Sequence, residues 1–134
     1  MNDLQTALPP IAMCAVDIER LGRLADAARE RHPQAAAFLA REVERAEMVN
    51  GDAPRPGLVT MGSRVRFRFG TDERVREATL VYPHEANAEA GRISVLTPIG
   101  AALIGLSVGQ SIEWQAPGGE WRFVTVLGEE PPES

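Results

Sequence analysis

A short run of small and aliphatic residues, TPIGAALIGL (97–106), lies between segments that have the alternating pattern of β-strands. Pro98 is suited to the first turn of a helix, and Gly105 to the position just beyond its end. Gly109 is then placed to turn the chain into the next strand. A helix this short must pack on the strands around it, so the sequence predicts a small, strongly curved sheet with one short helix.

The strands on either side are predicted from alternation with a period of two. In RVRFRF (64–69), apolar residues alternate with Arg64, Arg66 and Arg68, which places an arginine stripe on the outer face. Further strands are expected at 75–83, 92–97, 111–116 and 120–128. Guanidinium groups pair well with carboxylates, so the stripe is a candidate contact for an acidic partner; solubility and protection of a sheet edge are the other explanation.

The N-terminal third has apolar residues at helical spacing in two stretches. Asp17 is the expected N-cap of the first helix, and Pro33 both ends that helix and opens the second. The second stretch has the spacing of a coiled-coil seam, with apolar residues at Ala36, Leu39, Val43 and Ala46. We expect an α+β chain with a short antiparallel helical hairpin within residues 1–50, a linker at 51–57 and a sheet domain at 58–134.

Composition limits the possible functions. All 14 basic residues are arginine, so the lysine of a phosphate-binding loop and a Schiff-base lysine are excluded. A formal net charge of −5 leaves no basic surface for direct binding of nucleic acid, which is expected only through a partner. The lone Cys14 cannot form an internal disulfide, and no apolar stretch has the ~18 residues of a membrane span. We therefore expect a cytoplasmic monomer that does not enter the membrane.

Patterns typical of catalysis and metal binding are absent from the sequence. His32 and His84 are the only histidines, and neither has a cysteine or carboxylate cluster at metal-ligand spacing. No G-x-S-x-G sequence indicates a nucleophilic serine. The sequence therefore predicts no catalytic residue, no bound metal and no cofactor.

Three short motifs, taken with the order of hairpin, proline-bearing linker and strands, resemble those of the GreA/GreB transcription factors and, within that superfamily, of the Rnk family. The motifs are VTMGSRVRFRF (59–69), TLVYP (79–83) and TPIGAALIGLSVG (97–109). The similarity spans residues 15–128 and departs at Gln110, where Gre-type proteins usually have aspartate. It implies an FKBP-like C-terminal domain that binds RNA polymerase at the rim of its secondary channel.

The resemblance also implies candidate residues. The candidate partner-binding positions in the last motif are Thr97, Pro98, Gly100, Ala101, Leu103, Gly105 and Gly109. Gre factors insert a longer coiled coil whose tip carries paired acidic residues, which help to hold a second catalytic metal for transcript cleavage. The tip expected here, ARERHPQA (28–35), has Glu30 as its only acid, close to Arg31 and His32. We therefore expect a non-enzymatic regulator that competes with Gre-type factors without stimulating cleavage.

Two further hypotheses about function remain open. The Rnk family is linked to nucleoside diphosphate kinase levels, through an indirect effect on transcription or, as the weaker version, through direct contact with the kinase. The FKBP-like sheet could instead act as a peptidyl-prolyl isomerase or peptide-binding module, with Trp114, Trp121, Tyr82 and the phenylalanines lining a pocket. Core packing and cross-strand pairs explain these aromatic residues more simply.

The two parts of the chain are expected to divide the work. The helical hairpin has a thin, alanine-rich seam, and two short helices of this kind are marginally stable alone. We therefore expect the sheet domain to supply affinity for the partner and the hairpin to act as a steric plug.

Overall fold

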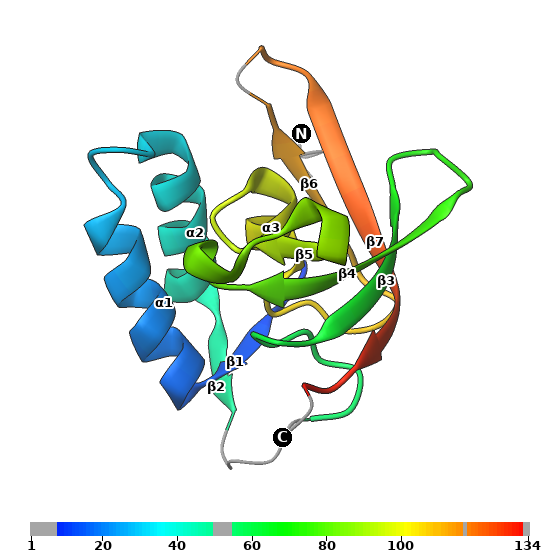
Figure 1. Cartoon of the computed structure of the whole chain (residues 1–134), viewed down its shortest axis with the longest axis horizontal. Coiled ribbons are helices and arrows are strands. Elements are labelled where there is room, and N and C mark those ends of the chain that lie inside the picture. Colours follow the sequence, from blue (N-terminus) through cyan, green and yellow to red (C-terminus); the bar gives the residue numbers. More distant parts are fainter. Residues whose placement is uncertain (1–7, 50–54, 117, 133–134) are drawn as a thin grey trace.

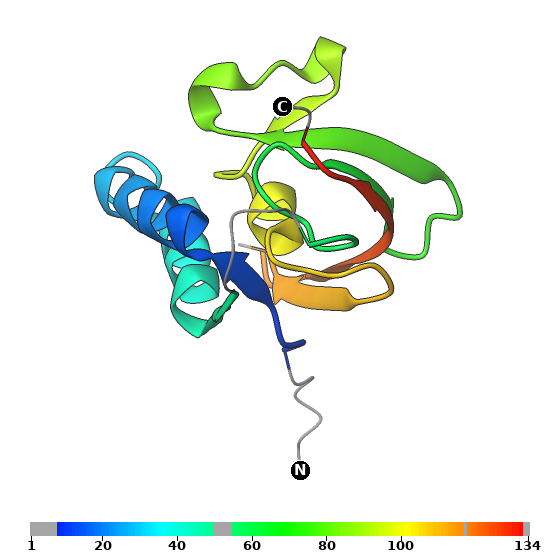
Figure 2. The same ribbon diagram turned by 90° about the horizontal axis from the view of Figure 1, so that it is seen from below.

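The computed structural model describes residues 8–49, 55–116 and 118–132. Two helices, α1 (Ala15–Ala27) and α2 (Pro33–Arg45), lie side by side in the N-terminal part, and a curled sheet forms most of the remainder (Figure 1). The strands curl around a third helix, α3 (Pro98–Leu103) (Figure 2). The predicted α+β class is confirmed. Most of the linker predicted at 51–57 lies outside the described residues.

The large sheet has the strand order β5-β4-β3-β7-β6. Its strands are β3 (Arg64–Phe69), β4 (Val75–Val81), β5 (Arg92–Ser94), β6 (Ser111–Gln115) and β7 (Trp121–Glu130). Neighbouring strands are antiparallel except β4 and β5, which are parallel. The prediction of an antiparallel sheet is therefore wrong at this edge. The segment 82–91 doubles back through the 3₁₀ turns η1 (Pro83–Glu85) and η2 (Ala88–Ala90) before β5 begins, so β5 runs in the direction of β4.

The helix α3 is fixed at both ends by specific residues. At its start, the Thr97 hydroxyl accepts a hydrogen bond from the Gly100 N–H (3.1 Å) and donates one to the Ser94 carbonyl (2.7 Å). Gly100 has no room for a side chain, because a Cβ there would overlap the Ser94 carbonyl. Just beyond the helix, Gly105 has a φ of +86°, which favours glycine. The predicted helix and its glycine stop are therefore confirmed.

Gln110 holds the turn that follows α3, at the position where the resemblance leads us to expect aspartate. Its side-chain oxygen accepts a hydrogen bond from the Ser107 N–H (2.9 Å). Its side-chain amide nitrogen donates to the Pro10 carbonyl (3.0 Å). The longer glutamine side chain thus closes the turn and also binds the N-terminal segment.

A small parallel pair of strands, β1 (Ala12–Cys14) and β2 (Glu47–Val49), flanks the two helices and is not predicted from the sequence. Strands of three residues have too little alternation to be recognised. The prediction that Asp17 caps α1 is wrong, because β1 runs directly into the helix and α1 already begins at Ala15. The Asp17 carboxylate is instead buried in the first turn and accepts a hydrogen bond from the Met61 N–H (3.4 Å).

The seam between the helices contains one residue that the apolar pattern does not indicate. Leu39 is fully buried as predicted, but Glu42 is fully buried as well. Its carboxylate accepts hydrogen bonds from Arg41 (2.7 Å) and Arg45 (2.8 Å), and Arg45 also donates to the Pro9 carbonyl. A buried carboxylate is tolerated only when it is paired, so this cluster ties the end of α2 to the N-terminal segment.

One hydrophobic core serves both parts of the chain. Its fully buried members include Met13, Leu21, Leu39, Val65, Val95 and Ile104. The Gly105 carbonyl accepts a hydrogen bond from the Ala12 N–H (3.1 Å), and the Gly105 N–H donates to the Val59 carbonyl (3.0 Å). The two helices are therefore packed against the sheet and share its core.

Candidate functional site

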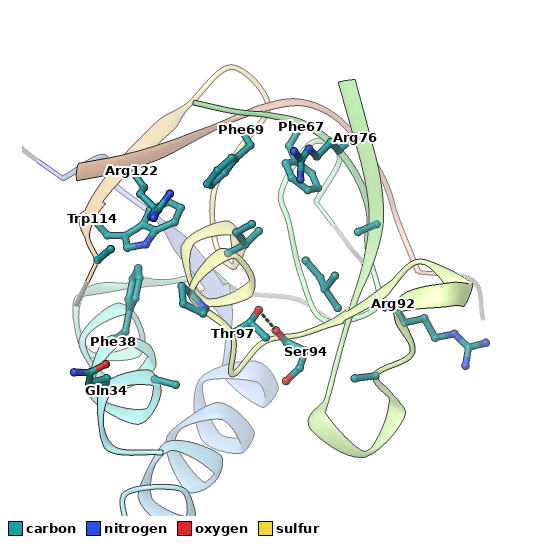
Figure 3. A pocket seen from close by; sticks show the side chains of 18 of the residues that line it. Gln34, Phe38, Phe67, Phe69, Arg76, Arg92, Ser94, Thr97, Trp114 and Arg122 are labelled. Carbon is teal, nitrogen blue, oxygen red and sulfur yellow. Dashed lines mark hydrogen bonds between the residues drawn. The ribbon is translucent and has the colours of Figure 1, made fainter. Parts of the chain in front are cut away.

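A groove of about 1300 Å³ runs across the inner face of the curled sheet (Figure 3). Its walls come from α2, the first turn of α3, the strands β3, β4 and β5 with the segment 86–91, and the hairpin of β6 and β7. The N-terminal helices and the sheet domain therefore contribute to one surface.

Aromatic side chains form the floor of the groove. The ring of Phe38 on α2 lies 6.1 Å from that of Trp114 on β6, and the ring of Phe69 on β3 lies 6.3 Å from the same tryptophan. Two guanidinium groups lie over these rings, Arg41 at 4.9 Å from the centre of Phe38 and Arg76 at 5.6 Å from that of Phe69. Guanidinium and aromatic groups attract each other in this geometry, which holds both arginines beside the floor.

The charged residues of the groove are mainly positive. Its lining contains four arginines and one carboxylate, namely Arg41, Arg76, Arg92, Arg122 and Glu77. Beside the groove, Glu42 and Asp72 each bind two arginines and Glu120 binds Arg122 (3.0 Å). These three carboxylates therefore contact five arginines, which leaves an excess of positive charge. Since the whole chain carries a net charge of −5, the groove is a positive surface on an acidic protein.

Asp72 stays ionised beside the groove. The Arg74 N–H donates a hydrogen bond to its carboxylate (2.9 Å), and this bond, with the Arg74 and Arg76 guanidinium groups, lowers the pKa of Asp72 below its ordinary value of 3.8. The carboxylate lies 3.6 Å from the Arg76 guanidinium. It therefore helps to position Arg76 over Phe69 at neutral pH.

The candidate residues of the motif at 97–109 fall into two groups. Thr97 and Pro98 are exposed and line the groove at the start of α3. Gly109 is exposed but lies outside the groove lining. The buried positions are Gly100, Ala101, Leu103 and Gly105. Only the exposed part of the motif is accessible to a partner.

The arginine stripe lies on the outer face of the sheet, on strand β3. Arg64 and Arg66 are exposed, and Arg68 is half-buried. The Arg64 guanidinium lies 3.5 Å from the Glu77 carboxylate. The Arg66 guanidinium lies over Gly128 and occupies the space that a side chain there would need. None of the three arginines lines the groove, and Arg64 contacts its lining only through Glu77.

The tip of the two helices is a turn at residues 28–32. It exposes the three predicted tip residues, Glu30, Arg31 and His32. The His32 side chain does not cap α2. Asp26, one helical turn earlier, faces Arg29 at 3.9 Å. The described tip therefore presents one free acid and not a pair of carboxylates.

Among the residues that the structure describes, no three histidine, cysteine or carboxylate side chains gather as a metal site requires. In the same part of the chain, no helix has the length and apolar character needed to cross a bilayer. His84 stacks on Tyr82, with 6.4 Å between ring centres, outside the groove lining.

Sequence reasoning missed most residues of the groove. Phe38 and Arg41 lie on α2 beside the predicted seam, and the other basic residues come from strands or their ends, namely Arg76, Arg92 and Arg122. The available signal was Phe38 itself, an aromatic residue outside an alanine-rich seam. Of the two tryptophans, Trp114 lines the groove, whereas Trp121 is 64% exposed and lies outside it.

Two family models match the chain. The model described as "Transcription elongation factor, GreA/GreB, C-term" matches residues 54–128, and the model "Rnk N-terminus" matches residues 9–49. The first match covers the large sheet and α3, and the second covers β1, β2 and the two helices, so the groove contains residues from both matches.

Individual relatives give the same result. The chain is 40% identical to the regulator of nucleoside diphosphate kinase of Escherichia coli K12 over 119 residues, which cover 89% of this chain and 88% of the relative. It is 44% identical to transcription elongation factor GreA of Rhodospirillum rubrum over 75 residues, which cover 56% of this chain and 48% of that protein. A solved structure of a transcription elongation factor GreA/GreB from Nitrosomonas europaea matches with a TM-score of 0.69 and 36% identity, over 90% of this chain and 99% of that one. The chain therefore belongs to the GreA/GreB transcription elongation factor family and, within it, to the Rnk branch.

Proposed function

We propose that this chain is a non-enzymatic transcription regulator that binds RNA polymerase near its secondary channel. There it competes with Gre-type factors and does not stimulate transcript cleavage. Membership of the GreA/GreB family supports binding to the polymerase, and the relatives are named as a regulator and as elongation factors. The chemistry of the helical tip is the observation that carries the absence of cleavage.

The tip lacks the paired carboxylates that a second catalytic metal needs. Glu30 stands between two arginines, and Asp26 faces Arg29 at 3.9 Å. Magnesium is held by carboxylate oxygens, whereas guanidinium groups next to an acid repel a cation. The helices α1 and α2 also have only 13 residues each, or about 20 Å at ~1.5 Å per residue. Both the chemistry and the short reach of the tip argue against cleavage.

The docking surface on this chain is the groove between α2 and the sheet. Thr97 and Pro98 lie at its edge, so these two exposed residues of the family motif are continuous with the aromatic floor. Arg64, Arg66 and Arg68 would make a separate contact with an acidic surface, because they lie on the outer face of the sheet.

Several properties follow from binding to the polymerase. Nucleic acid meets this regulator only through the polymerase, since the chain is acidic. A cytoplasmic monomer suits this role. The link to nucleoside diphosphate kinase, which the name of the Escherichia coli relative expresses, is indirect and runs through transcription.

Co-purification tests this function. An affinity-tagged chain is mixed with RNA polymerase, and a GreA protein is then added as competitor. Polymerase should co-purify with the tagged chain and should be released as GreA is added. Failure of polymerase to co-purify would exclude the proposed docking, and retention under saturating GreA would exclude a shared binding site.

A further inference from the structure

Helix α2 forms one wall of the groove, although it belongs to the N-terminal helical pair. The residues that line the groove from this side include Gln34, Ala37, Phe38 and Arg41. Phe38 points from α2 towards Trp114 on β6 (Figure 3). A segment that enters the groove therefore contacts the helical pair and the sheet at the same time.

We propose that α2 and the sheet together clamp an acidic segment of the partner protein that also carries apolar side chains. Phe38 and Arg41 are the main contacts that the helix makes. This inference rests on the proposed function, because it specifies which kind of partner segment the docking groove accepts.

The charge of the groove favours an acidic segment. The lining contains four arginines and a single glutamate, and three of the arginines also pair with carboxylates beside the groove, namely Arg41 with Glu42, Arg76 with Asp72 and Arg122 with Glu120. The side chains of Arg41, Arg76 and Arg122 are 46%, 44% and 43% exposed, so their guanidinium groups remain accessible. Arg92 extends outward at the opposite rim (Figure 3). Carboxylates of an incoming segment can therefore form charge-assisted hydrogen bonds along the rim.

The floor of the groove favours apolar side chains. The partly buried apolar residues that pack on the core and line the groove are Phe38, Phe69, Ile93 and Ile99. The part of each side chain that neither the core nor a guanidinium group covers is available to a partner. Burial of this surface supplies binding free energy, and aromatic residues are typical anchors of interfaces.

Single-stranded nucleic acid fits the groove less well than an acidic protein segment. Bases would bind by stacking on aromatic faces. Arg41 already lies over Phe38 and Arg76 over Phe69, and Trp114 is only 6% exposed.

The clamp gives the helical pair a different role from the steric plug expected from the sequence. Because α2 shares both the core and the groove with the sheet, the whole chain is the unit that binds. The helices should therefore contribute affinity directly.

Two matched substitutions on α2 test the clamp. Ala37 and Ala40 are both exposed positions of α2, but only Ala37 lines the groove. Ala37→Glu places a carboxylate one helical turn before Arg41, where it pairs with the guanidinium and repels an acidic segment. Ala40→Glu adds the same charge away from the groove. Affinity for RNA polymerase should fall about tenfold for Ala37→Glu and stay within about twofold for Ala40→Glu.

A second variant and two simple probes keep the test independent of the polymerase. Phe38→Ala should also weaken binding, and its melting temperature separates loss of contact from loss of fold. A fluorescein-labelled peptide of alternating glutamate and leucine should bind the wild-type chain, less tightly as salt is raised. An oligouridylate of similar length should not bind.

Each outcome decides one point. Equal affinity of Ala37→Glu and wild type for the polymerase overturns the clamp and leaves the proposed function intact. If the wild-type chain does not bind the polymerase, the proposed function fails, and binding of the labelled peptide then tests the clamp. Peptide binding that Ala37→Glu weakens and Ala40→Glu does not supports the clamp, and no peptide binding overturns it. If the chain binds the oligouridylate more tightly than the peptide, the groove accepts nucleic acid and the proposed protein segment is wrong.

Discussion

The ring of Phe38 on α2 lies 6.1 Å from the ring of Trp114 on β6, so the helical pair and the sheet share the floor of one groove. Both residues also pack with the common hydrophobic core. The helical pair and the sheet domain are therefore joined by side-chain contacts. Substitutions at the contacts between them should change the stability of the whole chain.

Gly105 lies at a contact between the N-terminal part and the sheet domain. Its φ is +86°, and a Cβ there would lie 3.1 Å from Cβ of Ile11 and 3.2 Å from the Ala12 carbonyl oxygen. Gly109 has a φ of +96° but open space around it, so it is a matched control. Gly109→Ala should lower the free energy of unfolding by about 1 kcal/mol through backbone strain, and Gly105→Ala by roughly 1–3 kcal/mol more. Urea unfolding followed by tryptophan fluorescence measures both; equal losses would show that β1 moves aside without cost.

The buried Glu42 should make the chain sensitive to its partner Arg45. Arg45→Met keeps an apolar stem but removes the 2.8 Å contact to Glu42 and the hydrogen bond to the Pro9 carbonyl. Loss of one partner of this buried carboxylate should lower the free energy of unfolding by roughly 3 kcal/mol. Arg31→Met, at the exposed tip, is the control and should change stability by less than about 0.5 kcal/mol. If thermal unfolding of the two variants is the same, the buried ion cluster does not stabilise the fold.

Asp17 should make stability depend on pH. Burial raises the pKa of its carboxyl above the ordinary 3.8, although the Met61 N–H and, more weakly, Cys14 and Arg20 act in the opposite direction. The folded chain therefore holds this proton more tightly than the unfolded chain. The contribution of Asp17 to stability is consequently full below pH 3.8 and decreases as the pH rises through the folded pKa.

Replacement of Asp17 by asparagine isolates this effect. Asp17→Asn keeps an oxygen that can accept the Met61 N–H but cannot ionise. It should be more stable than wild type at neutral pH, and the difference should shrink as the pH falls to the ordinary carboxyl range. Urea unfolding across this range provides the measurement. A variant that is less stable than wild type at neutral pH would show that the ionised carboxylate gains more from Met61 and Arg20 than it loses by burial.

Features with local causes could be predicted from the sequence. Pro98 and Gly105 fix the ends of α3 through backbone stereochemistry, and alternation fixes which face of β3 is buried. The burial of Glu42 does not have a local cause alone. It depends on Arg45, and the guanidinium group of Arg45 also binds the Pro9 carbonyl, 36 residues away in the sequence. Helical periodicity alone assigns a glutamate to solvent.

The groove shows the same limit for function. Thr97 and Pro98, the two predicted motif residues that line the groove, lie within one continuous segment, which is visible in the sequence. Phe38 and Trp114 come together only through the packing of α2 against the sheet. The arginine stripe of β3 is regular in sequence and therefore easy to notice, whereas the arginines of the groove are scattered along the chain.

Transcript cleavage in a backtracked RNA polymerase complex with magnesium measures the central claim most directly. We predict that the chain alone releases no 3′ RNA fragments above background, because its tip presents no pair of carboxylates. We also predict that it suppresses GreA-stimulated cleavage as its concentration is raised, because the proposed function has both proteins compete for one site. Release of 3′ fragments by the chain alone, or GreA-stimulated cleavage that a large excess of the chain leaves unchanged, would contradict this account.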